Sequence, residues 1–201
     1  MSRLVVLFAV MLLAPAAAVA QATVEAEQDA GDDVADQEIG ARIGMRMGGR
    51  TTPGGFHLGG VFLYRLNDEL WSDSLVAFAV GGGGAECFRD RGDNVLCDHG
   101  QLDGVAGGVH SGIRWVQPSK QGFVPYVRGT VGIELVNYSD DDVRGIAVPV
   151  VLGGGVRARV ADRVSVSGEA DLHIGFARLN RDMGVEPQAA LIVKLGVDFA
   201  L

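Results

Sequence analysis

The stretch VSVSGEADLHIGF, residues 164–176, alternates between two kinds of side chain. Every second residue, from Val164 to Phe176, is apolar or glycine, and the positions between them include Glu169, Asp171 and His173. A period of two is typical of a strand with one apolar and one polar face. In water the polar face would point outward, whereas in a lipid bilayer it would point inward. This stretch alone leaves both interpretations open.

The first 20 residues have the features of a secretory signal peptide. Arg3 is followed by an apolar run from Leu4 to Leu13, and Ala18-Val19-Ala20 forms a small-x-small cleavage site. The apolar run has ten residues, whereas a membrane-spanning helix needs about 20. We therefore expect residues 1–20 to be removed during Sec-type export.

An acidic segment follows at residues 21–38, with seven acidic residues and no basic ones. It shows no periodicity, so we interpret it as a disordered spacer. The formal net charge of the chain is −8, and this segment accounts for most of it, which leaves the body at 39–201 close to neutral. The body has no basic stripe, so we do not expect a nucleic-acid partner.

The alternation recurs in eight segments of the body, at 39–48, 56–65, 71–82, 104–116, 123–136, 146–160, 164–176 and 188–201. In 71–82 both faces are apolar, so its orientation stays undecided. Strands of soluble proteins cluster near five or six residues, but a tilted strand that crosses a bilayer needs about 9 to 11. The length of the segments therefore favours a membrane protein.

The connections support the same interpretation. Short ones at 67–70, 117–122 and 161–163 alternate with others at 49–55, 83–103, 137–145 and 177–187, most of which are longer. Lipid offers no hydrogen bonds, so a sheet that spans a bilayer must close on itself. We predict an all-β fold, an eight-stranded antiparallel up-and-down transmembrane β-barrel over 39–201, with an interior filled by side chains.

On this interpretation the polar faces line the barrel lumen. Because unpaired buried charges are costly, the lumenal side chains should pair with one another. The expected network comprises Arg42, Arg46, Arg114, Arg128, Arg157, Arg159 and Lys194 with Glu134, Glu169, Asp171, His173 and Asp198. In the hairpin of 146–160 with 164–176, Arg157 should oppose Ser167 and pair with the diagonal Glu169. Asp171 should look across the lumen to Lys194 or another basic residue.

Other candidate sites are few. Cys87 and Cys97 lie in the longest connection, and in an exported chain they should form a disulfide. His110 and Ser111 are adjacent, so on a strand they point to opposite faces and cannot form a catalytic pair directly. The acidic stretch SDDDVRG, 139–145, lacks the spacing of a calcium loop. We therefore expect no catalytic residue, metal site or cofactor.

The last eight residues, KLGVDFAL, carry a second targeting feature. Lys194, Gly196, Phe199 and Leu201 have the spacing polar-x-Gly-x-x-aromatic-x-hydrophobic. This resembles the C-terminal signal of outer-membrane barrels that the barrel-assembly machinery reads, although many members end in Phe or Trp. As a pattern, 39–201 resembles the small eight-stranded outer-membrane barrels (OmpA- and OmpX-like). The resemblance implies a monomer in the outer membrane of a Gram-negative bacterium, in contact with its lipid.

The function expected from these features is a non-catalytic structural or surface-interaction role, with a narrow solute path left open. One alternative is a soluble periplasmic barrel that binds an apolar ligand. The other is an outer-membrane lipid hydrolase, which would need a convergent Ser/His site that the sequence does not reveal.

Overall fold

The computed structural model describes residues 36–49, 52–84, 86–89, 95–98, 100–117, 119, 122–138, 142–180 and 184–201. The predicted signal peptide at 1–20 and nearly all of the predicted spacer at 21–38 lie outside these residues. Within them, no helix is long and apolar enough to cross a membrane.

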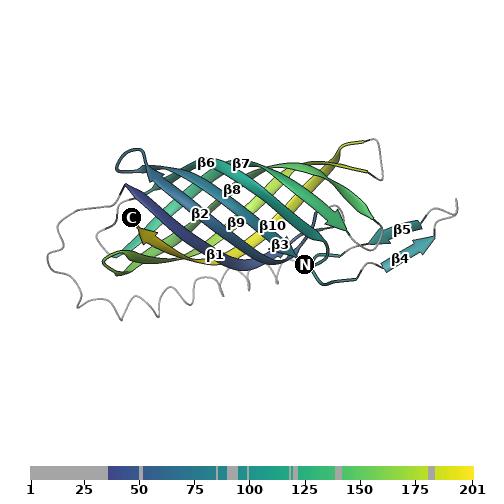
Figure 1. Ribbon diagram of the computed structural model, residues 1–201, viewed down its shortest axis with the longest axis horizontal. Helices are drawn as coiled ribbons and strands as arrows, with labels where there is room; N and C mark the ends of the chain where they lie inside the picture. The colour runs from purple at the N-terminus through teal and green to yellow at the C-terminus, as the bar shows by residue number, and fades with distance from the viewer. Residues whose placement is uncertain are drawn as a thin grey trace, which may run out of the picture. The chain divides into compact units, whose positions relative to one another are not determined.

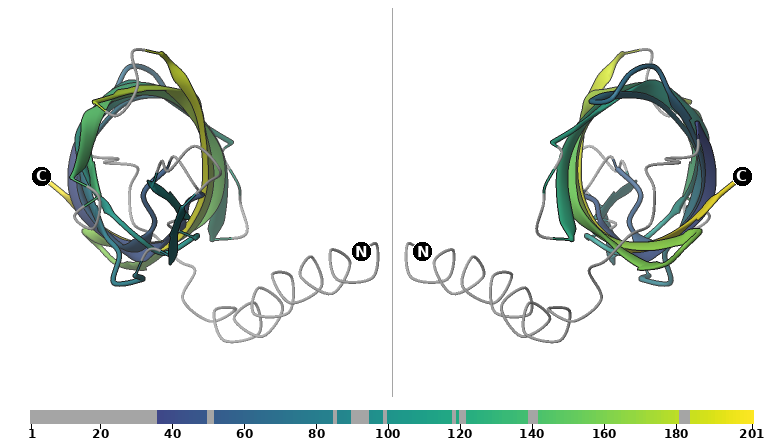
Figure 2. Two further views of the ribbon diagram at one scale, coloured as in Figure 1. Left: turned by 90° about the vertical axis from the view of Figure 1, so that its right-hand side faces the viewer. Right: turned by 90° about the vertical axis from the view of Figure 1, so that its left-hand side faces the viewer.

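Eight long antiparallel strands form a closed barrel (Figures 1 and 2). They are β1 (Gln37–Met47), β2 (Gly55–Arg65), β3 (Leu70–Val80), β6 (Val105–Val116), β7 (Phe123–Tyr138), β8 (Val143–Ala161), β9 (Val164–Leu179) and β10 (Glu186–Ala200). Each barrel strand pairs with the barrel strands that precede and follow it in the chain, and β1 pairs with β10 to close the barrel. The predicted fold class is confirmed, and each predicted segment coincides with one strand.

The strand ends differ from the prediction by a few residues. β1 begins at Gln37, within the segment predicted as spacer. β8 begins at Val143 and has 19 residues, and β7 and β9 have 16 each, against 11 in β1, β2 and β3. The wall formed by β7, β8 and β9 therefore has longer strands than the wall formed by β1, β2 and β3.

Two short strands that the sequence did not predict lie in the connection between β3 and β6. β4 (Glu86–Arg89) and β5 (Val95–Asp98) form a separate two-stranded antiparallel sheet. In this sheet Cys87 lies directly opposite Cys97, and the two form a disulfide with a Cα–Cα distance of 4.0 Å. The predicted disulfide is confirmed.

Alternate residues of each strand face opposite sides of the barrel wall. On β9, Val166, Leu172 and Ile174 are 38%, 43% and 51% exposed, whereas Glu169 and Asp171 are buried. The apolar face therefore points outward and the charged face inward, as in a barrel surrounded by lipid. The burial pattern also settles the orientation of β3, the strand that the sequence left undecided.

On β3 the buried, inward residues include Leu75, Ala77 and Ala79. The exposed, outward residues include Val76 and Phe78. The inward residues join two apolar clusters inside the barrel. One cluster holds Val61, Leu63, Trp71, Leu75 and Ala77, and the other holds Ala79, Ala106, Val136, Tyr138, Val143, Ala147, Ala177 and Leu179. The first cluster lies on β2 and β3, and the second lies mainly on β6 to β9.

The connections at the two barrel ends differ. At one end they are 66–69, 117–122 and 162–163, and at the other they are 48–54, 81–104, 139–142 and 180–185. The longest connection is at the second end, as predicted, but 139–142 is short because β7 and β8 extend toward it. In the first turn Asn67 Oδ1 accepts hydrogen bonds from the Glu69 and Leu70 amides at 3.0 and 2.8 Å.

Candidate functional site

The lumen holds a charge-balanced set of ionic side chains. Among the described residues, five basic and six acidic side chains are buried. The side chain of Arg157, which is 20% exposed, is a sixth basic member of the set. They are Arg42, Arg46, Arg114, Arg128, Arg157 and Lys194 with Glu38, Asp73, Glu134, Glu169, Asp171 and Asp198. Since each buried charge needs a counter-charge, this balance is what a closed interior requires.

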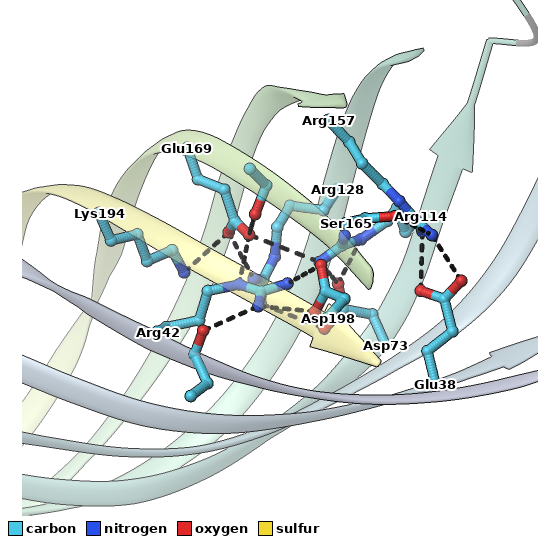
Figure 3. Close-up of polar contacts among 12 residues, drawn as sticks. Glu38, Arg42, Asp73, Arg114, Arg128, Arg157, Ser165, Glu169, Lys194 and Asp198 are labelled. Carbon is cyan, nitrogen blue, oxygen red and sulfur yellow. Dashed lines mark hydrogen bonds and ion pairs between the residues drawn. The ribbon is translucent and has the colours of Figure 1, made fainter. Parts of the chain in front are cut away.

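Glu169 is the centre of this network (Figure 3). Its carboxylate lies 2.5 Å from Arg42 Nε, 3.2 Å from Lys194 Nζ and 3.4 Å from Arg128 Nη1, and Arg114 Nη2 is 3.9 Å away. These cations come from β1, β10, β7 and β6, so one carboxylate on β9 holds together strands from opposite sides of the barrel.

Three further carboxylates share the same cations. Asp73 on β3 lies 2.9 Å from Arg114 Nη2 and 3.5 Å from Arg128 Nη2. Asp171 lies 2.6 Å from Lys194 Nζ, and Asp198 lies 2.7 Å from Arg42 Nη1. Each of the four central cations therefore contacts at least two carboxylates, so the pairs form a continuous network rather than isolated bridges.

Glycines opposite the carboxylates provide the space for this network. On β8, Gly153 and Gly155 lie opposite Asp171 and Glu169. A Cβ at Gly153 would overlap the Asp171 carboxylate, and one at Gly40 would overlap the Asp198 carboxylate. Any larger residue at Gly153 or Gly40 would force these buried acids to move.

A second carboxylate, Glu134 on β7, anchors a separate group of residues. Both of its oxygens accept hydrogen bonds from the Arg46 guanidinium, at 3.0 and 2.8 Å. Its Oε1 also lies 3.2 Å from His110 Nε2 and 3.5 Å from His173 Nδ1. The two imidazole rings meet edge to face with their centroids 5.5 Å apart.

The predicted pair Arg157–Glu169 is wrong. Arg157 does oppose Ser167 as predicted, but its guanidinium donates to both oxygens of Glu38, at 2.8 and 2.6 Å. On β8 the residue opposite Glu169 is Gly155, which has no side chain to pair with it. On β10 the residue opposite Glu169 is Lys194, so the cross-strand partner of Glu169 is on β10. Lys194 contacts Asp171 as well, from the neighbouring strand and not from across the lumen.

Arg159 lies outside the network, contrary to the prediction. It is exposed near the end of β8, and its guanidinium donates to the Asp162 carbonyl. β8 is irregular between Arg159 and Ala161, where the register with β9 shifts, so the inward alternation ends there. The other predicted network residues, including His173, are inside the barrel.

Two acidic members of the network were missed. Glu38 was assigned to the spacer, and Asp73 lies on the strand whose orientation the sequence left undecided. The charge count was the available signal that acids were missing, because the predicted network held seven basic residues and only four acidic ones. Such an excess signals missing counter-charges in a closed lumen.

The structure offers no support for a Ser/His pair at 110–111. His110 is buried in the lumen, and Ser111 is exposed on the outer face. Among the described residues, no three His, Cys, Asp or Glu side chains are grouped so that they could hold a metal ion. The charged side chains of the lumen are instead paired with one another.

Comparison with known proteins bears on the fold. No family model and no curated protein matches the sequence. Among solved structures, Neisserial surface protein A superposes with a TM-score of 0.61 at 13% identity, covering 83% of this chain and 97% of that one. The N-terminal barrel of Pseudomonas aeruginosa OprF gives 0.44 at 14% identity, over 81% and 97% of the two chains. Ail of Yersinia pestis gives 0.42 at 13% identity, over 82% and 99%.

The barrel of this chain has the fold of the small eight-stranded outer-membrane β-barrels. The likeness to Neisserial surface protein A carries this statement, together with the closed antiparallel order of the strands. At 13% identity it establishes the architecture and leaves the role to be argued from the residues.

Proposed function

We propose that the chain is an integral protein of the bacterial outer membrane with a non-catalytic structural or surface-interaction role. The observation that carries the proposal is the inverted polarity of the barrel, with large apolar side chains outside and an ion-paired core inside. In a soluble barrel, the exposed face would carry most of the charge. Here most of the charge lies on the buried face, and large apolar side chains cover most of the exposed face.

Outward-facing aromatic residues lie toward both ends of the barrel, as expected for the two interfaces of a bilayer. Tyr64, Trp115 and Phe199 are 41–47% exposed toward the end with the short turns, and Phe56 and Phe176 are exposed toward the other end. Aromatic side chains gather at the two interfaces of membrane barrels because their rings suit the headgroup region. Their positions support an apolar belt between these two levels.

The side chains in the lumen argue against an open channel. Its ionic side chains are buried and paired, so an ion that entered would have to displace several buried contacts. This favours a structural or surface role over transport. The disulfide-bonded β4–β5 sheet supplies a constrained element outside the barrel wall, in the longest connection.

We expect export and assembly to depend on two short segments of the chain. The signal peptide predicted at 1–20 would direct the chain out of the cytoplasm, and Lys194, Gly196, Phe199 and Leu201 would be read by the barrel-assembly machinery. Phe199 is exposed on the outer wall and Leu201 follows the end of β10, where another protein can reach them. We expect the assembled barrel to be monomeric and surrounded by outer-membrane lipid.

A substitution on the outer wall tests the proposal. Leu195 is 67% exposed on β10 and lies opposite Ile43 near the middle of β1. Arginine near the bilayer midplane costs about 2–4 kcal/mol, so Leu195→Arg should lower the free energy of unfolding in lipid vesicles by that amount. In a soluble protein, arginine at such an exposed site changes stability by about 0.5 kcal/mol or less.

Leu66→Arg is the matched control, because Leu66 is 55% exposed but lies in the turn after β2. It should leave the unfolding free energy nearly unchanged. Equal stabilities for the two variants, or a native protein that folds in buffer without lipid or detergent, would favour the soluble barrel and contradict the proposal.

A further inference from the structure

Three histidines from three strands face the lumen together. His57 on β2, His110 on β6 and His173 on β9 are each 3% exposed or less. We call them the histidine layer. His110 and His173 both lie within 3.5 Å of the Glu134 carboxylate, and neither ring nitrogen of His57 has a hydrogen-bond partner among the described residues.

The histidine layer is surrounded by groups whose charges are already paired. Lys194, Arg46 and Asp171 are close enough to His57 to interact with it electrostatically, as are Arg46 and Glu134 with His173. Lys194 is held by Asp171, and Arg46 is held by both oxygens of Glu134. The Glu134 carboxylate, which lies beside two residues of the layer, therefore already has a full counter-charge.

The lumen as a whole is balanced only while these imidazoles are neutral. Among the described residues, five basic and six acidic side chains are buried, and Arg157, which pairs with buried Glu38, brings the basic side chains to six without counting histidine. Each proton taken up by the histidine layer adds one positive charge, and every buried acid among the described residues is already paired. A buried charge of this kind is costly, and it would also compete with Arg46 for Glu134.

We propose that the histidine layer is an acid-sensitive lock on the closed lumen. At neutral pH the uncharged imidazoles fill the space around the Arg46–Glu134 pair. In acid the closed form must either keep these imidazoles neutral while the unfolded chain takes up protons, or accept a charge that weakens the link between β1 and β7 through that pair. Either way the closed form loses stability relative to the unfolded chain. The change is set by lumenal residues alone and needs no ligand.

The size of the effect follows from proton linkage. An imidazole in water takes up its proton near pH 6.5, whereas free carboxyl groups do so near pH 4. A histidine that stays neutral in the folded barrel but is protonated in the unfolded chain lowers the folding equilibrium constant about tenfold at pH 5.5. The sign is fixed, because stability is present above pH 6.5 and is lost as the pH falls below it.

The experiment compares the folding equilibrium constant at pH 7.5 and pH 5.5. It uses reversible urea unfolding of the full mature chain in lipid vesicles. The variants are the triple substitution His57→Gln, His110→Gln and His173→Gln, and the single substitution His57→Gln. Glutamine keeps a polar side chain in the lumen but has no group that titrates in this range.

The wild-type constant should fall between pH 7.5 and 5.5 by at least tenfold more than that of the triple variant. A smaller difference would overturn the proposal, whether because wild type is insensitive to acid or because the variant is equally sensitive. If the triple variant does not fold, His57→Gln decides instead. Its constant should fall about tenfold less than that of wild type, and an equal fall would overturn the proposal.

Discussion

The substitution Glu169→Gln should destabilise the barrel strongly, because it removes the one carboxylate that four cations share. Arg42, Lys194 and Arg128 lie within 3.4 Å of it, and Arg114 lies at 3.9 Å. Glutamine preserves the shape but leaves the lumen with one uncompensated positive charge. Breaking a buried ion pair in this way costs about 3–5 kcal/mol, so we expect a loss of that size.

The assay is equilibrium urea unfolding in lipid vesicles at pH 7.5, and the control is Asp142→Asn. Asp142 also pairs with an arginine, Arg144, but the two side chains are 76% and 69% exposed. An exposed pair contributes about 1 kcal/mol or less. If Glu169→Gln and Asp142→Asn lowered stability equally, the reasoning about a buried network would be refuted and the lumen would have to be well hydrated.

Three further predictions follow from the contacts. Arg157→Gln should destabilise the folded barrel more than Arg159→Gln, because Arg157 pairs with buried Glu38 and Arg159 is exposed; similar unfolding midpoints would contradict this. Protein from the cell envelope should show no free thiol at Cys87 or Cys97 by intact mass, and Cys87→Ser should leave barrel unfolding unchanged although the loop closure contributes about 2–3 kcal/mol to the hairpin itself. Planar bilayers containing the protein at pH 7.5 should carry no steady current, and open-channel conductance would show that the lumen is not closed by its ion pairs.

Local periodicity was enough to predict the eight strands and the way most of them face. A strand in a barrel wall has lipid on one side and the lumen on the other, so the polarity of each residue of β9 indicates which side it faces. That signal failed on β3, where the apolar lumenal clusters make both faces apolar. It also failed on β4 and β5, because strands of four residues are too short to show a clear alternation.

The partners within the lumen could be predicted only in part. The register of β8 with β9 was read correctly from the short turn between them, but register gives only cross-strand neighbours. Arg157 reaches Glu38 and Glu169 reaches Arg42, and both contacts join strands far apart in the sequence. Such pairs depend on barrel closure and on where glycines such as Gly155 leave space, which no single hairpin reveals.

The central claim is that the apolar wall faces lipid and the charged wall faces a closed lumen. The most direct measurement is the collision rate of nitroxide labels at Leu172 and Leu195 with oxygen, which concentrates in lipid, and with a water-soluble nickel complex. A label at Leu66 in the β2–β3 turn provides the aqueous reference. We predict high oxygen and low nickel accessibility at Leu172 and Leu195, with the reverse at Leu66. Nickel accessibility at Leu172 and Leu195 equal to that at Leu66 would contradict the account.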